Sequence, residues 1–238
     1  MKKLITITTL LAAGTLLANA ESLVLPASGL LEHDTYFSAH QGINKVFEKI
    51  QGKNYGAYAG NNGGSGGSWS DTVDTEGYWT NLGDGSGYIT LAGRNGTQGE
   101  SFGLMLGSEI VAGTTFNTLS LSVEVAANTY LNNKSMGFGI GLRSGTTTIG
   151  TETTTKTLSS SEATIFDIVL SFDELQTWTT GDKIMVAVGG PMFSPPEGTY
   201  TVKIKDVSYS TIPEPSAFGL LAGLGALALA GTRRRRRK

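Results

Sequence analysis

The sequence predicts a mainly β fold, specifically a β-sandwich of the jelly-roll kind, and three observations support this. Gly, Ser and Thr together account for 84 of the 238 residues, while charged residues are only 16%. Gly and Thr are poor helix formers. Beyond residue 88, apolar residues recur at every second position in short segments, and these segments do not alternate regularly with helices. The roughly 190 residues between the two ends suit one sandwich.

A short helix is the first element expected, over residues 38–51. Its apolar residues recur at helical spacing, at Ile43, Val46, Phe47 and Ile50. The next segment, residues 52–67, holds seven glycines in sixteen residues and predicts a flexible loop. A phosphate-binding loop would need a preceding strand, a following helix and a suitably placed Lys, and this segment has none of them.

Six later segments have the period of two that is typical of half-buried antiparallel strands. They are residues 88–91, 119–125, 136–142, 166–172, 184–188 and 200–205. Between two of them, residues 146–157 contain eight threonines in twelve positions. We expect this Thr-rich run to be either an exposed edge or loop, or a site for O-linked sugars.

Residues 1–20 have the pattern of a secretory signal peptide, including its signal helix. A basic start and a 14-residue apolar run precede a small-x-small cleavage site, formed by Ala18 and Ala20 before Glu21. The alternative is a buried N-terminal helix or strand. Export by the secretion machinery and cleavage by signal peptidase would make Glu21 the first residue of the mature chain.

The other end, residues 213–238, combines a tripeptide, an apolar segment and a basic terminus. The tripeptide is Pro213, Glu214 and Pro215. The apolar segment, residues 217–230, would span about 21 Å as a helix, short of the roughly 30 Å hydrocarbon core, and snorkelling arginines would cover part of the difference. Six cations then form a basic stop: Arg233, Arg234, Arg235, Arg236, Arg237 and Lys238. We therefore expect a transmembrane helix with its C-terminus in the cytoplasm.

These features, in this order, resemble the PEP-CTERM domain of bacteria with an outer membrane. The resemblance implies that an exosortase, a membrane transpeptidase-like enzyme, recognises the tripeptide and removes the helix. It further implies an exported protein, anchored transiently in the membrane and then placed on the cell surface or in the extracellular matrix. Residues 200–209 are also similar to the closing strand of extracellular jelly-roll and lectin-like modules.

The charge is unevenly distributed along the chain. Residues 21–212 contain 10 basic and 19 acidic residues, a net charge of −9, whereas both ends are basic. An acidic exported body makes nucleic acid a poor candidate partner. The absence of Cys from the sequence excludes disulfides and Cys-based zinc or redox sites.

No group of residues predicts a catalytic site. The two histidines are His33 and His40, and the sequence Glu32-His33-Asp34 is expected to be a surface turn and not a metal site. The Gly-x-Ser-x-Gly match at residues 63–67 lies in the Gly-rich segment and does not predict a nucleophile elbow. We therefore expect no catalytic residue, no resident metal and no cofactor.

One segment is a candidate glycan-binding site, because aromatic rings stack on sugars and carboxylates accept hydrogen bonds from hydroxyls. Its residues are Trp69, Asp71, Asp74, Glu76, Tyr78 and Trp79. The same acids, with Asp84, are also suited to a structural Ca²⁺. The third alternative is that the tryptophans anchor the core or a loop and the acids are solvated turn residues.

Three functions follow from these features. The first, which we favour, is a non-enzymatic cell-surface or extracellular-matrix protein. The second is a carbohydrate-binding module for extracellular polysaccharide. The third is a polysaccharide hydrolase, which would need two carboxylates about 5–10 Å apart in a cleft. Jelly rolls host all three, so the fold alone does not choose among them.

Overall fold

The computed structural model describes residues 20–27, 29–30, 32–33, 43–60, 78–93, 101–190 and 198–211. Residues Ala20–Thr211 form one compact unit. The predicted signal helix and transmembrane helix lie outside the described residues. In the part of the chain that the structure describes, no helix has the length and hydropathy of a membrane span.

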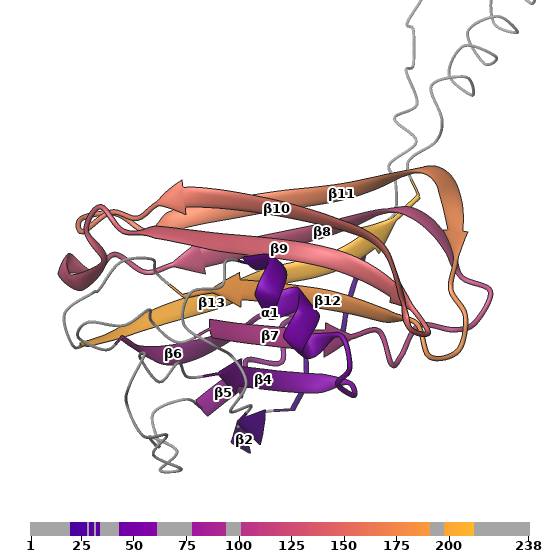
Figure 1. Ribbon diagram of the computed structural model, residues 1–238, viewed down its shortest axis with the longest axis horizontal. Helices are drawn as coiled ribbons and strands as arrows, with labels where there is room; N and C mark the ends of the chain where they lie inside the picture. The colour runs from indigo at the N-terminus through magenta and orange to yellow at the C-terminus, as the bar shows by residue number, and fades with distance from the viewer. Residues whose placement is uncertain are drawn as a thin grey trace, which may run out of the picture. The chain divides into compact units, whose positions relative to one another are not determined.

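Two sheets face each other, which confirms the predicted β-sandwich (Figure 1). Sheet A has seven strands: β11 (Thr164–Thr177), β8 (Thr115–Val125), β13 (Gly198–Ser210), β6 (Gly87–Gly93), β5 (Tyr78–Asn81) and β2 (Gly29–Leu30) in this spatial order, with β1 (Glu21–Ser22) beside β13. Sheet B has six: β10 (Thr147–Thr157), β9 (Ser135–Ser144), β12 (Lys183–Gly189), β7 (Ser101–Leu106), β4 (Gly56–Gly60) and β3 (Glu32–His33). A 3₁₀ turn, η1, covers Thr129–Leu131.

The order of the strands is that of a jelly roll. The eight consecutive strands β6 to β13 are divided between the sheets so that β6, β13, β8 and β11 are neighbours in sheet A, while β7, β12, β9 and β10 are neighbours in sheet B. All of these pairs are antiparallel. The chain therefore wraps around the core as two Greek keys. The earlier strands extend the two sheets at one edge, where β4, β5 and β2 lie (Figure 1).

Alternation of apolar and polar residues builds the core between the sheets. In β8, the inward-facing residues Leu119, Leu121, Val123 and Val125 are at most 1% exposed. They pair with the inward residues of β11, so that Val123 lies opposite Phe166 and Leu121 opposite Ile168. All six predicted strands are present, each extended by one or more residues at its ends.

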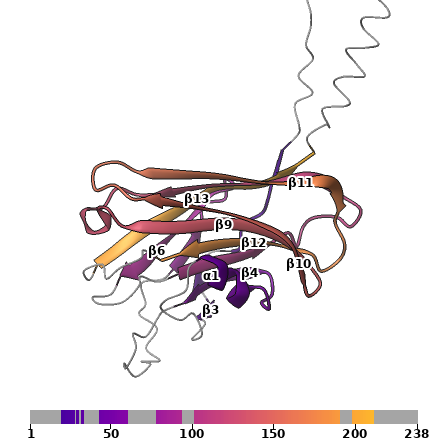
Figure 2. The ribbon, with the colours of Figure 1, turned by 45° about the horizontal axis from the view of Figure 1, so that its top comes forward.

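The predicted helix is present as α1, Ile43–Ile50; the first residues of the predicted range lie outside the described residues. Val46, Phe47 and Ile50 are buried against the outer face of sheet B, where they pack on Tyr58, Met105, Met185 and Ala187. Figure 2 shows α1 lying against β12 and β4. This helix therefore covers a sheet face that would otherwise be open to solvent.

Glycines on sheet B make room for the helix. A Cβ added to Gly103 would lie 2.7 Å from Ile50, and one added to Gly139 would lie 2.8 Å from the ring of Phe47. Such distances are shorter than real side-chain contacts, so a larger residue at either position would displace the helix. The glycines of β9 that face α1, Gly137 and Gly139, are thus explained by the close approach of the helix.

One prediction needs correction, because part of the Gly-rich loop expected over residues 52–67 is a strand. Residues Gly56–Gly60 form β4, which pairs with β7 from Gly56 opposite Met105 to Gly60 opposite Ser101. The segment has no apolar alternation, so periodicity could not reveal it. Its partner strand β7 supplies the hydrogen bonds that hold it extended.

Candidate functional site

Most of the predicted glycan segment lies outside the described residues, namely Trp69, Asp71, Asp74 and Glu76. Tyr78 is the first residue of β5, and its side chain is not described. Trp79 alone can be placed in full, and its burial is against the glycan-binding alternative for this ring. Its side chain is 1% exposed.

Trp79 is buried because its strand position points inward. It lies opposite the buried Ile89 in the β5–β6 pair. Its ring stacks on Phe102 with centroids 5.5 Å apart, and its indole N–H donates to the carbonyl of Pro26 at 3.0 Å. Trp79 is therefore a core residue, as the third alternative for this segment proposed, and cannot offer a ring face to a sugar.

The calcium hypothesis depends mainly on residues that are not described. Asp84 is the one described member, in the turn between β5 and β6. Its carboxylate accepts hydrogen bonds from the amide and hydroxyl of Ser86, at 2.9 and 2.6 Å. These bonds lower the pKa of Asp84. The described residues contain no group of three or more His, Asp or Glu able to hold a metal ion.

A cleft of about 460 Å³ lies at the edge where the early strands extend the two sheets; we call it the edge cleft. Its lining comes from the segment after β1, from β4 and β5, and from β7 and the turn after it. The lining residues are Val24, Leu25, Pro26, Ala27, Tyr55, Gly56, Ala57, Trp79, Met105, Leu106 and Ser108. Its volume is in the range of small-molecule sites, and its walls expose both polar and apolar surface.

Tyr55 is the exposed aromatic residue of this cleft, at 38% exposure. Its hydroxyl donates to the carbonyl of Asp182 at 2.8 Å, which fixes the orientation of the ring. Burial, followed by the negative charges of Asp182 and Glu109, raises the pKa of Tyr55. Glu109 in turn accepts a hydrogen bond from the amide of Val24 at 2.8 Å. The cleft thus combines a fixed ring with an acidic group held nearby.

A second hollow, of about 310 Å³, lies on sheet A, and we call it the sheet A hollow. Its lining residues are Leu82, Tyr88, Glu124, Ala126, Thr201 and Lys203. Tyr88 is 37% exposed, almost the same as Tyr55. Glu124 pairs with Lys205 at 3.5 Å. This hollow provides an internal comparison for the edge cleft.

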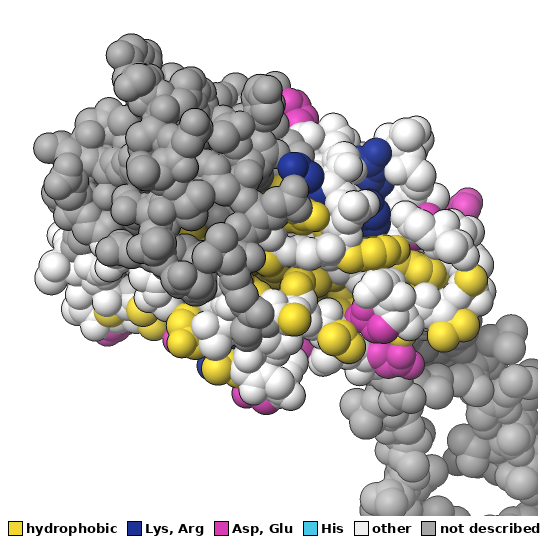
Figure 3. Space-filling model, turned by 90° about the horizontal axis from the view of Figure 1, so that it is seen from below, with side chains coloured by type: hydrophobic (Ala, Val, Ile, Leu, Met, Phe, Trp, Pro, Cys, Tyr) yellow, Lys and Arg dark blue, Asp and Glu magenta, His cyan; other side chains and the backbone are white. Residues whose placement is uncertain are grey.

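The face that contains the short strands β4 and β5 also carries basic side chains. Figure 3 shows Lys and Arg side chains beside an apolar strip on this face. Lys183 lies over the ring of Tyr55, with its Nζ 5.5 Å from the ring centroid. Sequence reasoning missed Tyr55 and Lys183, because 128 positions separate them and Tyr55 lies in a Gly-rich segment. The aromatic residues among those glycines were the available signal.

The Thr-rich run forms β10, an edge strand of sheet B. All of its residues are exposed or half-buried, which confirms the exposed edge. Its threonines lie opposite the glycines of β9, for example Thr153 opposite Gly139. O-linked glycosylation of this strand stays a prediction.

The two ends of the described body meet in sheet A. Of the predicted cleavage residues, Ala18 lies outside the described part, Ala20 is exposed and Glu21 begins β1. Glu21 lies opposite Tyr209 of β13, and the Tyr209 hydroxyl donates to its carboxylate. Burial and this hydrogen bond raise the pKa of Tyr209 to about 12. The body therefore begins and ends on adjacent strands.

The tripeptide, the apolar segment and the basic stop lie outside the described residues, and here the comparison with known families is informative. The model of the PEP-CTERM protein-sorting motif matches residues 211–237. This confirms the resemblance found in the sequence. The motif implies export and association with the cell surface through an exosortase. No curated protein matches the chain.

Several solved structures match part of the chain at low similarity. An arabinose-bound GH51 α-L-arabinofuranosidase is 12% identical with a TM-score of 0.35, over 52% of this chain and 19% of that chain, so this chain spans about a fifth of its length. A CBM4 structure is 18% identical with a TM-score of 0.34, and the match covers 55% of this chain and 87% of that chain. A structure of carbohydrate-binding modules of the β-sandwich superfamily is 12% identical with a TM-score of 0.34, and the match covers 52% of this chain and 46% of that chain. The chain is thus an exported β-sandwich protein with a PEP-CTERM sorting motif.

Proposed function

We propose that this chain is a non-enzymatic protein of the cell surface or extracellular matrix, delivered there through its C-terminal sorting motif. In this proposal a secretory signal peptide ends at Ala20, and an exosortase-like enzyme processes the tail at the membrane. The helix over residues 217–230 anchors the protein only until that processing occurs. The single observation that carries the proposal is the sorting motif at residues 211–237.

The short stretch of sequence between the end of the sandwich and the sorting tripeptide supports this role. Thr211 is the last described residue, and its hydroxyl donates to the carbonyl of Thr115 at 3.1 Å. The motif tripeptide begins two residues later, at Pro213. The linker between the anchored end of the sandwich and the processing signal is therefore very short. Two prolines keep such a stretch extended, which suits it to a peptidase groove.

Cell fractionation in the native host tests the sorting role. The variant Pro213→Ala/Glu214→Ala/Pro215→Ala is expected to remain in the inner membrane, whereas the wild type reaches the cell surface or the medium. Ser216→Ala, directly beside the tripeptide, is the matched control and should behave as wild type. The same distribution for the wild type and the triple variant would contradict the proposal.

A second candidate function is polysaccharide binding by the body, at the edge cleft. The specific observation in its favour is the half-exposed ring of Tyr55, fixed by the carbonyl of Asp182 in a cleft of about 460 Å³. An oriented ring loses little conformational entropy when a sugar stacks on it. Sugar hydroxyls would find a hydrogen-bond partner in Ser108, which lines the cleft and whose hydroxyl lies 3.4 Å from the Glu109 carboxylate.

Titration calorimetry against neutral and acidic polysaccharides tests this candidate. Tyr55→Ala is expected to weaken binding at least tenfold, because it removes the stacking ring. Tyr88→Ala, at equal exposure in the sheet A hollow, is the control and should leave binding unchanged. Equal loss in both variants, or no binding by the wild type to any polysaccharide, would refute it.

A further inference from the structure

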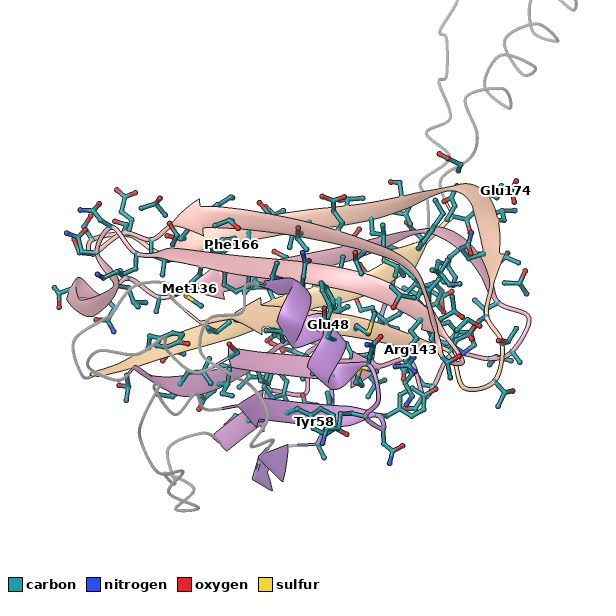
Figure 4. The ribbon with its side chains drawn as sticks, viewed as in Figure 1. Glu48, Tyr58, Met136, Arg143, Phe166 and Glu174 are labelled. Carbon is teal, nitrogen blue, oxygen red and sulfur yellow. The ribbon has the colours of Figure 1, made fainter. Side chains whose placement is uncertain are left out.

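Two cations face each other on the outer side of sheet B, at the end nearest Tyr55. Arg143 of β9 and Lys183 of β12 are direct register partners. Opposed residues in an antiparallel pair have their side chains on the same face, where like charges repel. Figure 4 shows Arg143 beyond the end of α1, and Tyr58 on β4, two strands beyond β12 in sheet B. We call Arg143 and Lys183 the cationic pair.

Neither member of the cationic pair has a carboxylate partner among the described residues. The Nε of Arg143 donates to the carbonyl of Gly145 at 2.7 Å, and the Nζ of Lys183 donates to the carbonyl of Lys53. The Nη1 of Arg143 is buried and has no hydrogen-bond partner within the described part of the chain. A buried guanidinium nitrogen without an acceptor is costly, so an anion that reached it after a small shift of the side chain would stabilise the site.

The two positive charges of the cationic pair also repel each other. Burial, followed by the charge of Arg143, lowers the pKa of Lys183. Asp182, next to Lys183 in the sequence, is already occupied, because both of its carboxylate oxygens accept hydrogen bonds from Thr179, at 2.8 Å each. Two adjacent cations that have no carboxylate partner among the described residues are unusual in a body whose net charge is −9. A bound anion would relieve their mutual repulsion.

The cationic pair is continuous with the edge cleft through one residue. Lys183 lies over the ring of Tyr55, and Tyr55 lines the cleft. A sugar stacked on the exposed part of this ring would have its substituents within reach of the Lys183 ammonium group. The ring and the cations together match a ligand that has both a pyranose face and a negative charge.

We propose that the cationic pair is a subsite for the carboxylate of an acidic polysaccharide, with Tyr55 stacking on the uronic acid ring. This inference rests on the second candidate function, polysaccharide binding at the edge cleft, and names its substrate class. Arg143 binds the carboxylate through its guanidinium group, and Lys183 adds the second charge. A polyanion is otherwise repelled by the acidic body, so the pair is required for its binding.

The test is calorimetry of the full mature chain with three probes: polygalacturonate, its fully methyl-esterified form and inorganic phosphate. The variant Arg143→Gln/Lys183→Gln is expected to weaken polygalacturonate binding at least tenfold. Lys203→Gln, which removes a cation from the sheet A hollow, is the matched control and should bind as wild type. Thermal unfolding of each variant checks the fold, and Arg143→Lys, which keeps the charge, should retain part of the affinity.

The outcomes separate this inference from the function on which it rests. Preference of the wild type for polygalacturonate over the esterified polymer, lost in the double variant, supports the acidic subsite. Equal binding of both polymers, unchanged in the double variant, overturns the subsite and leaves polysaccharide binding intact. Binding of neither polymer overturns both. Phosphate that binds the pair as tightly as the polymer would show a site for small anions only and would also overturn the inference.

Discussion

Replacing Trp79 tests whether this residue stabilises the core or binds a ligand. Its ring is 1% exposed, stacks on Phe102 at 5.5 Å and donates its N–H to the carbonyl of Pro26. Gly87 packs so closely on the ring that a Cβ there would lie 2.4 Å from it. Loss of such a ring costs about 3–5 kcal/mol in transfer and cavity energy. Trp79→Ala is therefore expected to destabilise the body by that amount.

Urea unfolding and calorimetry of residues 21–212 measure this change. For a domain of this size each kcal/mol shifts Tm by roughly 2–4 °C, so we expect a fall of about 6–20 °C. Trp79→Phe keeps much of the volume and loses the hydrogen bond, so its expected cost is about 1–2 kcal/mol. A free energy of unfolding within about 0.5 kcal/mol of wild type for Trp79→Ala would refute the placement of this ring in the core.

Two further predictions concern the helix and the paired termini of the body. Gly139→Val places a side chain 2.8 Å from the ring of Phe47 and should cost about 1–3 kcal/mol; Gly52→Ala, which meets no atom within 4 Å, should stay within about 1 kcal/mol of wild type. The pKa of Tyr209 is raised to about 12 in the folded state, so the unfolded state releases its proton first and stability should fall as the pH rises from about 10 to 12. Tyr209→Phe should reduce this fall in alkaline unfolding experiments, and an unchanged pH profile would contradict the assignment.

The six predicted strands have apolar residues at every second position, and these residues are buried in the core. In β8 the buried Leu121 and Val123 alternate with Ser122, and the pattern identifies the strand directly. In β10 the threonines are exposed on both sides, and in β4 the sequence Gly-Ala-Tyr-Ala-Gly has almost no apolar contrast. Both strands form because a neighbouring strand supplies their hydrogen bonds. Such pairing between distant segments leaves no pattern in the local sequence.

The candidate site could be predicted only in part for a related reason. Aromatic residues beside acids suggested a glycan site near Trp79, but the strand register turns that ring inward. The edge cleft instead depends on Tyr55 and Ser108, which come from distant parts of the chain. Arg143 and Lys183 become neighbours only through pairing of β9 with β12. The sorting motif, by contrast, is a contiguous sequence signal and was found without the fold.

The central claim is that an exosortase processes the C-terminal tail of this protein. The mass of the mature protein from its native host tests this claim most directly. Intact-mass measurement, with and without a functional exosortase, locates both ends of the chain. We predict an N-terminus at Glu21 in both strains. We also predict loss of the helix over residues 217–230 together with the basic stop, but only when the enzyme is present. A mature C-terminus at Lys238 in both strains would contradict processing and would make the helix a permanent anchor.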